Sequence, residues 1–421
     1  MAALTAVLCG AGGRGFYAYS PYAQQNPDRL RFVAVAEPND ERRARFAEAH
    51  GIPAERQFRS WEDLIAQGKI ADTCFNMTQD QMHRDSTIAA LEQGYDVLLE
   101  KPMANQLSDS VALVQAAERH GRLLQICHVL RYTPFFETIN RIVRSGRLGD
   151  LVSVTHRENV VFWHMAHSFV RGNWRNLASS SPMILAKCCH DLDILFWNTG
   201  AAKQLHSFGS LLHFHPENKP ANATARCTDG CPAAESCPFD ARRVYLNMEN
   251  TYWPVTTITN DLSYESRLKA LQEGPYGRCV YQCDNDVVDH QVVSYETASG
   301  ATVTLTMQGH AHRESRSMRY DGTRATMRAS FEYGGGAVEI SDHVTGITEQ
   351  VPVEIRSGGH GGGDFGIVHS FVQAMRGEAE PLTTARESLE SHLMAFAAEE
   401  SRQTKQVIDM AEYRQRAERL G

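Results

Sequence analysis

Several features are scarce in this chain of 421 residues, and each absence excludes a class of protein. Lys and Arg total 42 against 50 Asp and Glu, and no basic run occurs, so nucleic acid and anionic membranes are not expected partners. No apolar stretch reaches the roughly 20 residues that a bilayer-spanning helix needs. The first apolar segment begins near Leu4, which leaves no room for a cleavable leader. We therefore expect a cytoplasmic protein.

The length suits two domains, and an apolar content of 42% is enough to build their cores. Strand-like and helix-like segments alternate over the first third, which predicts a doubly wound parallel sheet of the Rossmann type. Extended segments dominate after about residue 126 and predict an α+β domain with a large, mainly antiparallel open sheet. We place the domains at 1–125 and 126–421, with a Cys-rich insertion at about 215–285.

The pattern predicts individual elements as well. Strands are expected at 4–10, 31–36, 71–76, 95–99 and 123–127, and later at 150–162, 203–214, 287–297, 300–309, 324–332 and 336–341. Helices are expected near 14–25, 40–50, 83–93, 106–120, 134–145, 189–199, 364–376, 384–401 and 406–418.

The first strand ends in a glycine cluster typical of a dinucleotide-binding turn. Gly10 allows a tight turn, Gly12 lets the backbone approach a pyrophosphate, and Gly15 lets the next helix pack closely on the strand. The helix N-terminus then offers unpaired N–H groups to the phosphates. The alternative is a plain tight turn without a ligand.

Glu37 ends the second strand and can accept hydrogen bonds from both ribose hydroxyls, which favours NAD over NADP. Arg14 is the one residue nearby that favours the alternative, because it can pair with a 2′-phosphate. Ligands bind beyond the carboxyl ends of such strands. The expected cofactor-binding residues are therefore Gly10, Gly12, Gly13, Arg14, Gly15, Glu37, Asn76, Thr78, His83, Glu100 and Lys101.

Two segments carry candidate proton-transfer groups. Pro102 restrains Lys101 at a strand end, where its ammonium can reach a substrate hydroxyl; a surface strand exit is the alternative. Further on, His190 lies three residues from both Lys187 and Asp193, so the three can share one helical face. His190 is a candidate general base and Asp193 can orient its ring, whereas a buried structural histidine is the alternative.

The ten cysteines fall into two groups. Five are scattered, and a reducing compartment argues against disulfides. The other five cluster as Cys227-x3-Cys231-x5-Cys237 and Cys279-x3-Cys283 in a turn-rich region. We predict a structural zinc held by Cys227, Cys231, Cys237 and a fourth thiolate from Cys279 or Cys283, with free thiols as the alternative.

Gly-x-Gly-x-Arg-Gly at the first turn, Glu100-Lys101-Pro102, and His190-x-x-Asp193 at a helix start together resemble the Gfo/Idh/MocA oxidoreductase family. The resemblance spans essentially the whole chain. It implies NAD-dependent chemistry on sugars or cyclitols, catalytic roles for Lys101 and His190, and a homo-oligomer, either a dimer or a tetramer. Many members carry an acid four residues before the histidine, but this chain has Ala186 there, and Lys187 is a candidate second cation.

A narrower resemblance rests on residues 166–175, 187–193 and 279–286, which are similar to a sub-branch near the NAD-dependent glycoside hydrolases, such as sulfoquinovosidases. It implies hydrolysis by transient oxidation at C3, elimination between C1 and C2, water addition and re-reduction. Anionic glycosides are candidate substrates, because cations and aromatic rings gather in these segments. The expected substrate-binding residues are His167, Arg171, Trp174, Asp193 and His360, the last from the glycine-rich segment 358–364.

The sequence thus predicts an NAD enzyme acting on a sugar or glycoside. The alternatives are a sugar dehydrogenase that releases NADH and a non-catalytic NAD-binding regulator. Lys101 and His190 argue against the regulator.

Overall fold

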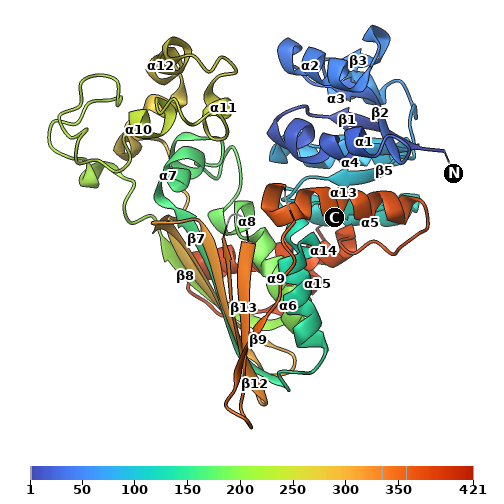
Figure 1. Ribbon diagram of the computed structural model, residues 1–421, viewed down its shortest axis with the longest axis vertical. Coiled ribbons are helices and arrows are strands. Elements are labelled where there is room, and N and C mark those ends of the chain that lie inside the picture. The colour runs from blue at the N-terminus through green and yellow to red at the C-terminus, as the bar shows by residue number, and fades with distance from the viewer. Residues whose placement is uncertain (1, 333–334, 357, 421) are drawn as a thin grey trace.

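The computed structural model describes residues 2–332, 335–356 and 358–420 (Figure 1). Its upper part in Figure 1 holds a parallel sheet between helices, and its lower part holds a larger sheet. The predicted fold class is confirmed. Among the described helices, none combines the length and the apolar character needed to span a bilayer.

The N-terminal sheet is parallel throughout and has the strand order β3-β2-β1-β4-β5-β6, that of a dinucleotide-binding Rossmann fold. Its strands are β1 (Leu4–Cys9), β2 (Leu30–Ala36), β3 (Gln57–Phe58), β4 (Thr73–Asn76), β5 (Asp96–Leu99) and β6 (Leu124–Ile126). Its helical segments are η1 (Arg14–Tyr19), α1 (Ser20–Gln25), α2 (Asp40–His50), η2 (Ala54–Arg56), α3 (Trp61–Ile65), η3 (Asp80–Met82), α4 (His83–Glu92) and α5 (Leu107–His120). The strands are almost wholly buried, as expected for a sheet covered on both faces.

The C-terminal sheet has nine described strands in the order β14-β13-β12-β11-β7-β10-β9-β8-β15. They are β7 (Leu151–Val161), β8 (Ala202–Ser210), β9 (His290–Thr297), β10 (Thr302–Ala311), β11 (Ser315–Gly322), β12 (Ala325–Glu332), β13 (Gly335–Asp342), β14 (Thr348–Val351) and β15 (Ile408–Asp409). All neighbours are antiparallel except β7 and β10. On β10, buried Val303, Leu305 and Met307 alternate with more exposed threonines, so one face of the strand points into the core.

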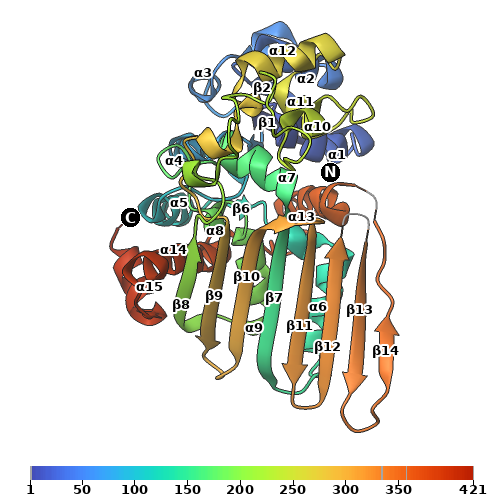
Figure 2. The same ribbon diagram turned by 90° about the vertical axis from the view of Figure 1, so that its left-hand side faces the viewer.

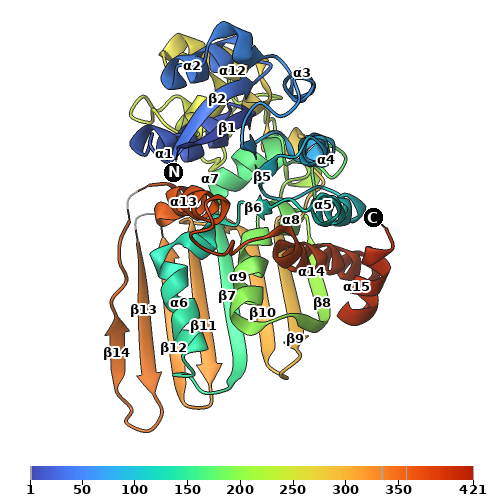
Figure 3. The same cartoon turned by 90° about the vertical axis from the view of Figure 1, so that its right-hand side faces the viewer.

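Helices cover only one face of this sheet. They are α6 (Pro134–Arg144), α8 (Met183–Ala186), α9 (Cys189–Thr199), α14 (Ala385–Thr404) and α15 (Met410–Glu418). Figure 3 shows these helices in front of the sheet, whereas Figure 2 shows the opposite face with no helix over the strands.

Helix α13 (Gly363–Met375) returns from the C-terminal part of the chain to the N-terminal sheet. Its buried Ile367, Val368 and Phe371 join the core around Leu8 and Phe75. The two-domain division at residue 125 therefore stays a prediction, to which the structure adds a late helix that packs with the first domain.

The insertion between β8 and β9 forms short helices beside the large sheet, opposite the N-terminal domain in Figure 1. They are η6 (Pro216–Asn218), α10 (Ala241–Tyr245), α11 (Val255–Ile258), α12 (Tyr264–Glu273), η7 (Pro275–Gly277) and η8 (Val280–Gln282). A small core of Ala241, Tyr245, Val255 and Leu271 holds them together. Four further helical segments lie elsewhere in the described residues: η4 (Val129–Tyr132), α7 (Phe162–His164), η5 (Met165–Arg171) and η9 (Gly359–Gly362).

A fully buried ion pair joins η4 to α9. Nε and Nη2 of Arg131 each donate to Asp193 at 2.7 Å, and neither side chain is more than 1% exposed, whereas Nη1 donates at 3.2 Å to the more exposed Glu387. Removing one member of such a pair leaves an uncompensated buried charge.

We expect Asp193→Ala to lower the free energy of unfolding by about 3–5 kcal/mol, because Arg131 would lose its buried partner. Urea denaturation followed by far-UV circular dichroism measures this change. Arg386→Met is the matched control, because its pair with Glu118 is about half exposed and should be worth no more than about 1 kcal/mol. Equal effects of the two substitutions would contradict the prediction.

Candidate functional site

The turn after β1 requires glycine at two positions. Gly10 has φ +93°, and a Cβ there would lie 2.4 Å from the Met77 carbonyl oxygen. A Cβ on Gly15 would lie 2.2 Å from the Gly10 carbonyl oxygen, so the helix packs directly on the turn. At Gly12, by contrast, a Cβ would meet no described atom within 4 Å. The turn is therefore tight on its protein side and open where a pyrophosphate would approach.

Glu37, at the end of β2, lies against this turn although its side chain is almost fully buried. Its Oε2 accepts a hydrogen bond from the Ala11 amide at 2.8 Å, and its Oε1 accepts one from the Asn39 amide at 3.1 Å. A carboxylate held beside the glycine turn fits the ribose of a dinucleotide. The residues present therefore fit NAD.

Arg14 points away from Glu37 and joins two other carboxylates. Its Nε donates to Glu100 at 2.6 Å, and its terminal nitrogens donate to Asp364 at 2.8 and 3.1 Å. Burial acts to raise the pKa values of Glu100 and Asp364, but Arg14, together with Lys101 at Glu100 and His360 at Asp364, holds both pKa values below their usual range. Arg14 is thus committed to these pairs, which argues against its predicted alternative role with a 2′-phosphate.

The ends of β4 and β5 are fixed by polar contacts. Asn76 donates from Nδ2 to the hydroxyls of Ser86 and Thr87, and its Oδ1 accepts from the Thr78 hydroxyl at 2.8 Å. The buried ring of His83 lies with Nδ1 2.8 Å from the Pro102 carbonyl oxygen. His83 therefore supports the Lys101–Pro102 segment, whose peptide bond is cis, rather than standing open to a cofactor.

Lys101 and His190 meet where the two domains face each other. Lys101 Nζ donates to the carbonyl oxygen of Ala186 at 3.1 Å, four residues before His190. The His190 ring is 4% exposed, and its Nδ1 has no hydrogen-bond partner within the described chain. Burial, reinforced by the charge of Lys101, holds the pKa of His190 well below its usual value. A neutral imidazole with an unpartnered nitrogen near a lysine can take a proton from a substrate hydroxyl.

A network of buried charges surrounds Lys187. Its Nζ lies 2.7 Å from Glu314 and 3.1 Å from Glu158, and Arg316 lies 2.9 Å from Glu158 and 2.8 Å from Asp191. Burial raises the pKa of Glu158 to about 7, against the pull of Arg316 and Lys187. The sequence predictions missed Glu158, Glu314 and Arg316. The only signal for them is a charged side chain within a strand pattern, which is also what an exposed strand face produces.

The residues predicted to bind substrate are dispersed. Asp193 pairs with Arg131 and does not orient the His190 ring. Arg171 donates to the carbonyl oxygens of Arg278 and Phe239 at 2.8 Å, within the insertion.

Two other predicted residues, Trp174 and His167, make contacts with different parts of the chain. Trp174 donates from Nε1 to Asp80 at 3.1 Å, across to the N-terminal domain. His167 stacks on Tyr276 with ring centroids 4.8 Å apart.

His360 stands beside the catalytic candidates. Its ring centroid lies 6.1 Å from that of His190, and its Nδ1 lies 2.9 Å from Asp364. The surrounding glycines make this placement possible, because Gly361 and Gly362 adopt φ values of +66° and +88°. The glycine-rich segment is thus an ordered turn that brings His360 over His190.

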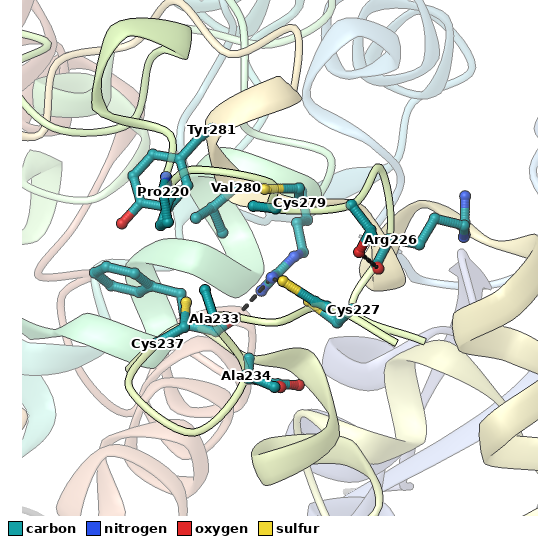
Figure 4. A pocket seen from close by; sticks show the side chains of 15 residues that line it. Pro220, Arg226, Cys227, Ala233, Ala234, Cys237, Cys279, Val280 and Tyr281 are labelled. Carbon is teal, nitrogen blue, oxygen red and sulfur yellow. Dashed lines mark hydrogen bonds between the residues drawn. The ribbon is translucent and has the colours of Figure 1, made fainter. Parts of the chain in front are cut away.

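Four of the clustered cysteines line one small pocket in the insertion (Figure 4): Cys227, Cys231, Cys237 and Cys279. Cys283 lies outside it and donates its thiol to the Cys279 carbonyl oxygen at 3.3 Å. Arg171 enters the same pocket, with a guanidinium nitrogen 3.6 Å from the Cys227 sulfur. Within the described residues, no three His, Cys, Asp or Glu side chains stand close enough together to form a metal site. The predicted zinc site is therefore not assembled in the structure.

Comparison with known families agrees with this geometry. The model of an oxidoreductase family with an NAD-binding Rossmann fold matches residues 4–128. The model of the C-terminal alpha/beta domain of the same oxidoreductase family matches residues 141–410.

Individual relatives are distant. YteT of Bacillus subtilis, a protein named as an oxidoreductase, is 21% identical over 85% of this chain and 86% of its own length. Inositol 2-dehydrogenase of Corynebacterium glutamicum is 25% identical over 40% of this chain and 46% of its own length. The WlbA dehydrogenase of Bordetella pertussis, solved with NADH and UDP-GlcNAcA, superposes with a TM-score of 0.67 at 18% identity, over 96% of this chain and 98% of that chain. At this identity the last similarity shows the fold alone.

Proposed function

Because this chain belongs to the Gfo/Idh/MocA family of NAD-dependent oxidoreductases, we propose that it oxidises a hydroxyl-bearing carbon of a sugar or related polyol and releases NADH. The observation that carries the proposal is that Lys101, at a Rossmann strand end, bonds the Ala186 carbonyl oxygen four residues before His190, and that burial and the Lys101 charge keep the His190 ring neutral by lowering its pKa. When bound, NAD supplies the hydride acceptor. The non-catalytic regulator has no support from this arrangement, since a regulator needs no open imidazole at that place.

In this proposal the protein's own groups manage the hydroxyl proton. Lys101 donates a hydrogen bond to the substrate oxygen, and His190 Nδ1 accepts its proton as the carbonyl forms. Glu100 holds the backbone amide of Lys101 at 2.6 Å and so fixes the lysine at the strand end. His360 closes the other side of the imidazole.

NAD rather than NADP is the proposed cofactor, with Glu37 as the selecting residue. A 2′-phosphate would meet the buried Glu37 carboxylate, and the nearby cation Arg14 is already paired with Glu100 and Asp364. NADP should therefore bind more weakly than NAD, because its 2′-phosphate would be repelled by a like charge and would find no cation to compensate.

Glycoside hydrolysis by transient oxidation at C3 is the second candidate. It requires a cofactor that stays bound between turnovers. The observation that favours it is a pair of contacts from the C-terminal part of the chain to the N-terminal domain, Asn260 to Glu41 at 2.9 Å and Trp174 to Asp80 at 3.1 Å. The relatives named as an oxidoreductase and as an inositol 2-dehydrogenase, however, support simple oxidation better than hydrolysis.

We also propose that the four pocket cysteines hold a structural zinc ion once the metal is supplied. At each of Cys231, Cys237 and Cys279 the backbone amide two residues further on favours the thiolate, and at Cys231 such amides outweigh burial and lower the pKa. Amides directed at sulfur suit a metal-bound thiolate. Binding requires the Arg171 guanidinium to withdraw from Cys227.

We further propose that the protein forms a dimer or a tetramer in the cytoplasm. The subunits would join through the face of the large sheet that no helix covers (Figure 2). Exposed Phe208 and Val152 lie on strands of this sheet.

Lys101→Met and His190→Asn should each lower the rate of NADH formation by about 10²–10⁴-fold, because each removes a proton-transfer group. The measurement is absorbance at the NADH band across a panel of sugars and polyols, and Lys203→Met on exposed β8 is the control. Since burial keeps His190 neutral, the acid limb of the wild-type pH profile should lie below the ordinary histidine pKa of about 6.5.

The same reactions separate the two candidate activities. Simple oxidation consumes NAD in proportion to substrate, whereas hydrolysis accumulates no NADH and, in deuterated water, labels C2 of the released sugar. Firm NAD binding with neither NADH nor label across glycosides and free sugars would contradict both.

Glu37→Ala should narrow the preference for NAD over NADP, because it removes both the ribose contact and the repulsion. We expect the wild type to bind NAD at least about tenfold more tightly, a difference of about 1.4 kcal/mol. Calorimetric titration with each cofactor measures it, and Glu48→Ala on the exposed side of α2 is the control. Equal wild-type affinities would exclude Glu37 as the selecting residue.

Protein purified with zinc present should hold about one zinc per chain, because four thiolates complete a tetrahedral site. Cys231→Ser should lose the metal and unfold at lower temperature, whereas Cys283→Ser should keep both metal and stability. Elemental analysis and thermal denaturation measure these outcomes. Failure of the reduced wild type to take up added zinc would end the proposal.

A further inference from the structure

Aromatic side chains from two segments form a cluster beside the candidate site. Trp253 of the insertion lies 5.4 Å from Trp163, 4.8 Å from His164 and 5.2 Å from His167 between ring centroids. Tyr276 stacks on the far side of His167 at 4.8 Å. We call these five residues the aromatic platform.

One part of the platform is buried in the protein and another part is exposed to solvent. His167 is buried, and its Nδ1 lies 2.6 Å from the Tyr245 hydroxyl. Trp253, by contrast, is 43% exposed, and its neighbour Tyr252 is 79% exposed. A large aromatic ring that is fixed at its edges but left open to solvent suits stacking against a ligand.

The platform is linked to the catalytic candidates through Glu314, which contacts both His164 and Lys187. His164 Nδ1 lies 3.1 Å from Glu314, and Glu314 lies 2.7 Å from Lys187. Lys187 precedes His190 by three residues, and the positive charge of Lys101 also acts on the His164 ring. Contacts therefore run from the start of α9 through Lys187 and Glu314 to His164, which places the platform on this side of the candidate site.

The charges between His190 and the platform are already balanced. Lys187 and Arg316 face Glu314 and Asp191, and burial raises the pKa of Glu158 to about 7, so its charge is only partial at neutral pH. Arg175, further along, pairs with Asp284 at 2.8 Å. Lys187, Arg316 and Arg175 thus each face a carboxylate, and burial lowers the pKa of His164 and His167 in the platform itself, so the platform offers no unbalanced positive charge to an anionic ring.

We propose that the aromatic platform binds the ring next to the one that is oxidised, so that the substrate is a neutral glycoside or oligosaccharide. The C–H face of a neutral pyranose stacks on Trp253, and the hydroxyls of the oxidised ring meet Lys101 and His190. This inference rests on the proposed function for the position of the oxidised ring. It departs from the sequence-based expectation of an anionic glycoside, whose cations the structure shows to be paired.

The test is a binding titration of the NAD-loaded protein with maltose, cellobiose, lactose and xylobiose, with their constituent monosaccharides, and with glucuronic acid. Intrinsic tryptophan fluorescence and calorimetry report binding without turnover. We expect at least one disaccharide to bind about tenfold more tightly than its monosaccharides. Trp253→Ala should abolish that advantage and Trp253→Phe should retain most of it, because phenylalanine keeps a stacking face.

Tyr264→Ala is the control, an aromatic deletion on α12 with 46% exposure and no part in the platform. Equal loss in the control and Trp253→Ala, a monosaccharide or glucuronic acid as the tightest ligand, or no saccharide binding at all would each overturn the proposal. NADH formation is measured separately. A disaccharide that binds through Trp253 but yields no NADH would contradict the oxidation proposal and support the platform proposal. Oxidation without a preference for disaccharides would support the oxidation proposal and contradict the platform proposal.

Discussion

The position of His190 depends on two aspartates that follow it in the first turn of α9. Asp191 is bound to Arg316 of β11 at 2.8 Å and to His156 of β7 at 2.7 Å, which fixes the helix start to the large sheet. Asp193 is bound to Arg131 of η4, which fixes the same turn to the segment leaving the N-terminal domain. The imidazole that precedes them is therefore placed by ion pairs that it does not make itself.

Buried pairs of this kind contribute little net stability, because desolvation offsets most of the Coulomb attraction. What they supply here is position. Arg14 does the same on the cofactor side, where it joins Glu100 at the end of β5 to Asp364 at the start of α13. Since Asp364 also holds His360, a single guanidinium links the strand that carries Lys101 to the turn that covers His190. Geometry at the site is thus set by arginine–carboxylate pairs between distant parts of the sequence.

The sequence predicted the fold well and the site only in part. Long elements with clear periodicity, such as α14 and β10, were found within a few residues, because burial of one face requires their pattern. Strand β11 was missed, since Arg316 and Arg319 interrupt its alternation with charges whose partners are remote. The contacts of Asp193 and Arg171 were not predicted for the same reason. The sequence shows the residue type and predicts the helix, but it does not show which remote residue is the partner, and Arg131 lies 62 positions from Asp193. The sequence also could not tell that Cys279 lines the pocket of the other three cysteines whereas Cys283 lies outside it, because the two residues are only four positions apart.

The distribution of charge limits what the site can recognise. A substrate that enters the balanced network around Lys187 has to be held by hydrogen bonds and by stacking rather than by a net field. Hydroxyl groups suit the first requirement, because they both donate and accept, and His190 Nδ1 and Lys101 Nζ present an acceptor and a donor close together. The exposed indole of Trp253 suits the second, because sugar rings have an apolar face of C–H groups. Compensated charges around Lys187, an unpartnered imidazole nitrogen and an exposed aromatic face are consistent with one kind of ligand, an uncharged polyol with at least one further ring.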